Sequence, residues 1–259
     1  MKNSIKATLI WSVLATLGIS GLAKANYVNQ TPSPVAIMPQ HHSSTQMLLS
    51  QETNQKPDSI NDNDAEVNDE TIPTSLSKVS EEGENIYDMA KVNDWSKTSA
   101  SLTSLENAAK SLHTQIQGKN KPELAQLDSR IAALKGTVTT KNRLATMQNG
   151  NQVTLIAAQI TKQFEPKVPV EITLLDYYGR ELEIWSATGN TGKLKVTANE
   201  MRLTWDAVRP SILAHKADVE AQKFDALVAS VQAAKSPQEY NRLATPVLNQ
   251  VDTLEKVFK

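Results

Sequence analysis

The chain contains the same five residues twice, as Asn142-Arg143-Leu144-Ala145-Thr146 and as Asn241-Arg242-Leu243-Ala244-Thr245. In both places the tripeptide Asn-Gln-Val follows within a few positions, at 151–153 and 249–251. Self-similarity at a long, nearly constant spacing is the sequence signature of a repeated structural unit. The two strings therefore predict that the chain is built from two copies of one unit.

The residues that precede each string also align, at a spacing of 96 or 97 positions. Gly83 falls on Gly179, and apolar residues fall on apolar residues. The apolar pairs are Ile86 with Leu182, Met89 with Trp185, Leu105 with Met201, Leu112 with Val208 and Leu127 with Phe224. Both copies are interrupted near the same point, at Asn93-Asp94 and Gly189-Asn190, and both end on phenylalanine. We expect copies at about 81–164 and 170–258.

From Glu81 onward, apolar residues recur in alternating steps of three and four, which predicts amphipathic helices. One run is Leu102, Leu105, Ala109, Leu112 and Ile116, and another is Leu194, Ala198, Met201, Trp205, Val208 and Ile212. No segment of this region alternates with period two, so we predict an all-α fold. Each copy reads as a helical hairpin whose apolar stripe needs a partner, and two hairpins would pair into an elongated antiparallel four-helix bundle. The arms, about 60 Å long at 1.5 Å per residue, either run straight or consist of two shorter helices joined at a kink.

The N-terminus has the features of a cleavable signal peptide over residues 1–25. Lys2 and Lys6 precede an apolar run, and Ala23-Lys24-Ala25 places small residues before the cleavage point. The alternative is an uncleaved membrane anchor, for which the run is near the lower limit of roughly 17–25 residues. We expect export to a bacterial periplasm, with no stable membrane insertion of the mature chain.

Residues 26–80 are rich in Gln, Asn, Ser, Thr, Pro and acidic side chains. Across 51–71 the only aliphatic side chains are Ile60 and Val67. Such a segment cannot bury enough apolar surface to offset its ordering entropy, so we predict a disordered polar linker.

Composition excludes several function classes. The chain has no cysteine, and therefore no disulfide, no thiol nucleophile and no covalent haem attachment. Removal of residues 1–25 takes away three lysines and changes the net charge from −1 to −4, which does not favour a nucleic-acid partner. We find no phosphate loop, nucleophile elbow or zinc-protease motif, so we do not expect an enzyme.

Two sets of residues are candidates for a site. His113 and His215 are candidate metal ligands, because the duplication places both near one end of the bundle, although neither belongs to the Glu-x-x-His motif of a di-iron bundle. Asp176, Tyr177, Arg180 and Glu183 form a candidate polar binding patch, and Asp176 and Arg180 have the i, i+4 spacing of a helical ion pair. The alternative interpretation of this segment is a helix whose apolar stripe packs into the core and whose charged side chains are solvated.

The sequence thus favours a non-enzymatic binding or scaffold protein of the cell envelope. Its partner would be an unknown envelope protein or a small ligand, and we expect no bound cofactor. The alternative function is a periplasmic metal- or haem-binding four-helix bundle.

Overall fold

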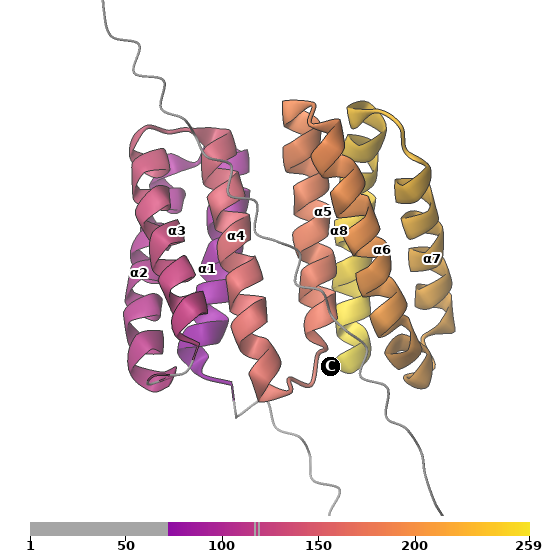
Figure 1. Ribbon diagram of the computed structural model, residues 1–259, viewed down its shortest axis with the longest axis horizontal. Helices are drawn as coiled ribbons and strands as arrows, with labels where there is room; N and C mark the ends of the chain where they lie inside the picture. The colour runs from indigo at the N-terminus through magenta and orange to yellow at the C-terminus, as the bar shows by residue number, and fades with distance from the viewer. Residues whose placement is uncertain (1–71, 117, 119) are drawn as a thin grey trace, which may run out of the picture. The chain divides into compact units, whose positions relative to one another are not determined.

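The computed structural model describes residues 72–116, 118 and 120–259, which are helical apart from short connections (Figure 1). The predicted signal peptide and residues 26–71 of the predicted linker lie outside this range. The helices are α1 Thr74–Lys91, α2 Trp95–Ile116, α3 Lys121–Thr139, α4 Arg143–Thr161, α5 Val170–Thr188, α6 Thr191–Ala214, α7 Asp218–Ala233 and α8 Pro237–Glu255, with 3-10 turns η2 Lys162–Phe164 and η3 Lys256–Phe258. The prediction of an all-α fold is confirmed for the described residues.

The helical region begins earlier than the sequence indicated. We predicted linker up to residue 80, but α1 starts at Thr74. Leu76 and Val79, which are 1% and 0% exposed, pack into the apolar core that α1 shares with its neighbours. Residues 74–80 are therefore helix rather than linker, because two apolar side chains one turn apart suffice to bury this segment.

The helices form two groups, which we call the first half (α1–α4 with η2) and the second half (α5–α8 with η3). Within each half, consecutive helices pack together and the last helix returns to the first (Figure 1). Each half has its own apolar core, around residues such as Leu105 and Leu127 in the first and Met201 and Phe224 in the second.

This arrangement differs from the predicted single bundle of four long arms. Each predicted arm consists of two helices that fold back on each other, so a half covers its own apolar stripe without help from the other half. The chain reverses direction at the breaks that the sequence marked. Asn93 and Gly189 there have positive φ, 59° and 67°, which lies in the left-handed region.

The two breaks match in detail. Asp94 Oδ1 accepts a hydrogen bond from the Lys97 amide at 3.1 Å, and Asn190 Oδ1 accepts one from the Lys193 amide at 3.0 Å. Each side chain satisfies an amide of the first helical turn that has no partner within the helix. The same turn and the same cap thus begin the second helix of both halves.

The aligned glycines match as well. Gly83 in α1 faces α4, where a Cβ atom would lie 3.0 Å from Val153 Cγ1, and Gly179 in α5 faces α8, where a Cβ would lie 2.6 Å from Leu248 Cδ2. In both halves, a glycine therefore lets the first helix approach the last closely.

The repeated pentapeptide does not have the same local role in its two positions. Asn142 is the N-cap of α4, and its side chain accepts from the Ala145 amide at 3.2 Å. Asn241 lies inside α8, which is capped by Ser236 instead. Of the described helices, none combines the length and apolar character required to cross a membrane.

Candidate functional site

The predicted binding patch lies between the two halves. We call the contacts of α5 with α1 and α4 the seam. Arg180 is 7% exposed and forms the predicted ion pair with Asp176, with Nη1 2.8 Å from Oδ2. Its Nη2 lies 3.4 Å from Glu84 Oε2 of α1, and its Cζ lies 5.4 Å from the centre of the Tyr87 ring. Arg180 therefore links the second half to the first through both charge and cation–π contact.

Glu183 and Tyr177 also contact the first half. Glu183 Oε2 accepts from Tyr87 Oη and from Lys91 Nζ, both at 2.8 Å. The Tyr177 hydroxyl accepts from Gln152 Nε2 of α4 at 2.7 Å. The four predicted patch side chains are thus held by contacts inside the molecule.

The seam also contains buried polar residues that were not among the candidate site residues from the sequence. Glu181, 6% exposed, accepts from Trp185 Nε1 and from Asn151 Nδ2, the latter at 3.3 Å. Asn151 Nδ2 is also 3.2 Å from the carbonyl oxygen of Tyr177. Asn151 starts the first Asn-Gln-Val tripeptide, so the repeat was the signal that could have indicated it.

Burial alters the protonation of the seam. It raises the pKa of Glu84 to about 7, with Arg180 opposing the rise and the negative charge of Asp176 adding to it. Burial also raises the pKa of Asp176 and that of Glu181 above their usual values. Removing a carboxylate from water disfavours its charged form, which is the common cause. Burying these acidic groups in the seam therefore costs more folding free energy as the pH rises, because a larger fraction of them must carry charge.

The two histidines lie in separate places. His113 of α2 is paired with Asp128 of α3, with Nε2 3.0 Å from Oδ1. His215, at the end of α6, packs its ring edge-on against Phe258, with centroids 4.7 Å apart. Within the described residues, no group of three or more His, Cys, Asp or Glu side chains is arranged to hold a metal ion.

A pocket of about 600 Å³ lies where the two halves meet, at the start of α4, the end of α5 and the start of α8. We call it the inter-half pocket. Its lining consists of Arg143, Leu144, Met147, Glu183, Ser186, Ala187, Pro237, Gln238, Asn241 and Arg242. The two arginines are the second residues of the two repeated pentapeptides. The volume is in the range of about 300–1,000 Å³ that small-molecule sites occupy.

The positively and negatively charged side chains that line this pocket differ in whether they are paired. The Arg143 side chain makes no hydrogen bond or ion pair with any other described residue, and the one bond from the Arg242 side chain is to its own helix, from Nε to the Gln238 carbonyl at 3.3 Å. Glu183, by contrast, is neutralised by Lys91. Nearby Glu239 accepts from the Lys235 amide at 2.8 Å. Two guanidinium groups thus lie at the pocket outside any ion pair among the described residues, and the Lys235 amide and the Arg242 charge both lower the pKa of the neighbouring Glu239.

The lining residue Ser186 has a hydroxyl whose oxygen is covered by protein atoms. Ser186 Oγ is buried and has no hydrogen-bond partner among the described residues. A buried hydroxyl without a partner is costly unless a ligand or water satisfies it.

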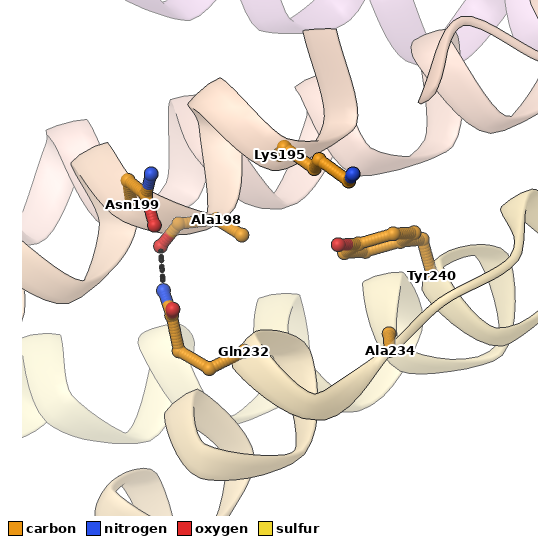
Figure 2. A pocket seen from close by; sticks show the side chains of 6 residues that line it. All are labelled: Lys195, Ala198, Asn199, Gln232, Ala234 and Tyr240. Atoms are coloured by element: carbon orange, nitrogen blue, oxygen red, sulfur yellow. Dashed lines mark hydrogen bonds between the residues drawn. The ribbon is translucent and has the colours of Figure 1, made fainter. Parts of the chain in front are cut away.

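A second cavity, of about 230 Å³, lies within the second half between α6, the end of α7 and the start of α8. Figure 2 shows Lys195, Ala198 and Asn199 on one side and Gln232, Ala234 and Tyr240 on the other. Gln232 Nε2 donates to the Ala198 carbonyl across it at 2.6 Å. This bond satisfies both of its atoms and ties α7 to α6, so we assign the cavity a structural role.

Comparisons with protein-family models, curated proteins and solved structures found no match to this chain. The function of the site therefore has to be inferred from its geometry. The sequence does not indicate the other lining residues as parts of a site, because only tertiary packing brings these helix ends together. They include Met147, Ser186, Ala187, Pro237 and Gln238. The arginines did carry a signal, since they belong to the repeated string.

Proposed function

We propose that this chain is an exported, non-enzymatic binding protein of the bacterial cell envelope, and that it binds a small ligand in the inter-half pocket. One observation carries the proposal. Arg143 and Arg242, which occupy equivalent places in the repeated pentapeptide, line a single pocket and belong to no ion pair among the described residues. Side chains held apart from internal ion pairs are available for a ligand.

The chemistry of the lining supports binding rather than catalysis. General acid–base catalysis needs a titratable group that is free to exchange a proton with the substrate. Glu183 is held by Tyr87 and Lys91. Ser186 has no described hydrogen-bond partner that could activate it as a nucleophile. Histidine and cysteine are not among the lining residues.

The position in the envelope rests on the sequence of residues 1–25, with its basic start, apolar run and small residues before the cleavage point. In this proposal, residues 26–71 act as a polar linker that precedes the helical region. A binding protein exported in this way can work without disulfides, because each half has a core of its own.

A pocket-filling variant tests the proposal. Ala187→Trp places a large side chain at the inter-half pocket, while Ala100→Trp adds the same side chain at an exposed position of α2. The purified chain is screened by thermal melting against a panel of anionic, neutral and cationic small molecules. We expect at least one compound to raise the melting temperature of the wild type and of A100W, but not that of A187W.

Two outcomes would count against the proposal. If no compound stabilises the chain, or if A187W responds as the wild type does, the inter-half pocket is not the ligand site. Iron, copper or zinc retained in stoichiometric amount through a desalting column would instead support the alternative of a metal- or haem-binding protein.

A further inference from the structure

We propose that the ligand of the inter-half pocket is an anionic amphiphile, with a phosphate or carboxylate group bound by Arg143 and Arg242 and an apolar portion bound over Leu144 and Ala187. This inference rests on the proposed function and specifies its ligand class.

The sign of the charge follows from the pairing of the lining residues. The Lys91–Glu183 ion pair, at 2.8 Å, is neutral as a unit. The two arginines leave the pocket with a net positive charge even when Glu239, whose pKa the Lys235 amide and the Arg242 charge both lower, is counted beside them. The complete chain carries a net charge of −1, so this local excess is not a property of the surface in general. Guanidinium groups present planar pairs of N–H donors that match the oxygen atoms of phosphate and carboxylate.

The backbone around the pocket adds to this preference. The first turns of α4 and α8 line it through Arg143 and Pro237, and a helix start carries partial positive charge even where Asn142 and Ser236 each cap one amide. The last turn of α5 also lines the pocket and contributes partial negative charge from its carbonyls. Two helix starts and two arginines outweigh one helix end.

The apolar part of the lining makes a simple inorganic anion an incomplete ligand. The lining residues Leu144, Ala187 and Pro237 offer apolar surface to the pocket, whereas Met147, which also lines it, is only 2% exposed. Met147 belongs to the small apolar cluster of the seam with Tyr87, Ala90 and Ile184. Methionine side chains are flexible and accommodate apolar groups of varied shape. An anion that also carries an apolar chain would therefore use both parts of the pocket.

Titration calorimetry of the full chain tests the inference with four probes: inorganic phosphate, butyl phosphate, octyl phosphate and the uncharged octyl glucoside. The amphiphiles are kept below their micelle-forming concentrations. We expect affinity to increase from inorganic phosphate to octyl phosphate, by up to about fourfold for each methylene that is buried. Octyl glucoside should bind at least tenfold more weakly than octyl phosphate. Octanoate distinguishes a carboxylate head group from a phosphate.

Variants identify the contacts. Arg143→Gln and Arg242→Gln should each weaken the binding of octyl phosphate about tenfold, and high salt should weaken the binding to the wild type. Arg202→Gln is the matched control, because Arg202 is exposed on α6, pairs with Asp206 and does not line the pocket. R202Q should bind as the wild type does. Circular dichroism checks that each variant stays helical.

The results separate this inference from the proposed function. Equal affinity for octyl glucoside and octyl phosphate, or no effect of R143Q and R242Q, would overturn the anionic ligand class. The proposed function would survive that result if A187W still abolished binding. Failure of every probe, together with no A187W-sensitive ligand in the wider panel, would overturn both.

Discussion

Gly83 and Gly150 face each other where α1 packs against α4, so that a Cβ on Gly150 would lie 2.9 Å from the Gly83 carbonyl oxygen. In the opposite direction, a Cβ on Gly83 would lie 3.1 Å from the Gly150 carbonyl oxygen. The obstacle at Gly150 is backbone, which cannot rotate away as a side chain can. This pair of glycines sets the distance between the first and last helices of the first half.

Gly150→Ala should therefore destabilise the protein. Alanine favours a helix over glycine by up to about 1 kcal/mol, but the clash with α1 should cost about 1–3 kcal/mol through a shift of the helices. Gly136→Ala is the control, because a Cβ added to Gly136 in α3 would have nothing within 4 Å, and it should stabilise by about 0.5–1 kcal/mol. Urea unfolding measures both changes. A stabilising effect of G150A would contradict the close approach of the two helices.

The stability of the seam should depend on pH. The folded pKa of Glu84 is about 7, above its ordinary value of 4.5, so the folded chain binds a proton more tightly than the unfolded chain does. This contribution to stability is fully present below pH 4.5 and is lost as the pH rises to about 7. The Glu84 side chain is 38% exposed, so solvent screening should limit the loss to about 1 kcal/mol.

Glu84→Gln tests the assignment, since glutamine cannot ionise. The free energy of unfolding of E84Q should vary less between pH 5 and pH 7 than that of the wild type. Glu81→Gln, an exposed change in the same helix, should leave the pH profile unchanged. Parallel profiles for E84Q and the wild type would assign the pH dependence to other groups, such as Asp176 or Glu181.

Asp225 should contribute to stability through two donors. It accepts from Trp205 Nε1 at 2.7 Å and from the Arg209 guanidinium, and these bonds lower its pKa. Asp225→Asn should cost about 1 kcal/mol, a modest value because both charged side chains are 38% exposed. Its stabilising contribution is present at neutral pH and is lost as the pH falls below about 4.

Asp206→Asn is the control for this change, because Asp206 pairs with Arg202 on the exposed side of α6. Thermal unfolding followed by tryptophan fluorescence should show a lower midpoint for D225N and almost no change in the midpoint for D206N. Equal effects of the two variants would mean that the contacts of Asp225 stabilise the protein no more than the exposed ion pair of Asp206 does.

Export should be accompanied by cleavage after Ala25. When the full-length chain is produced in a bacterium, N-terminal sequencing of the periplasmic fraction should give a chain that begins at Asn26. Ala25→Arg should block the cleavage, because the peptidase requires a small residue at that position. A wild-type chain that stays in the membrane at full length would support an uncleaved anchor.

The sequence allowed much of the local structure to be predicted. The breaks at Asn93 and Gly189 are the same capped turn, and Gly83 and Gly179 are the same close approach. The angle at each break was not predictable, because residues that end a helix do not fix the direction of the next one. A reversal rather than a kink produced the two halves of four helices each that the structure describes.

The surroundings of α5 show a second limit. The apolar stripe of Leu175 and Leu182 packs into the core of the second half. Arg180, on another face, would be solvated if α5 were covered on one side only. It is buried because α1 packs against that face. A hydrophobic stripe identifies one buried face of a helix and contains no information about a second, polar one.

The inter-half pocket also could not be predicted from the sequence. The repeated pentapeptide indicated a duplication, but it could not indicate that Arg143 and Arg242 meet at one pocket. That meeting depends on how the two halves pack. Neither the spacing of the arginines nor their neighbours in the sequence encodes this packing.

The connection between the halves is short. Residues 165–169 join η2 to α5 and include Pro166 and Pro169. Even fully extended, such a segment spans only about 20 Å. Each half therefore meets the other at an effective concentration in the millimolar range, as for modules joined by a short linker. A seam of polar contacts around one small apolar cluster then needs less binding free energy than an interface between two separate molecules, and a ligand at the junction can alter that balance.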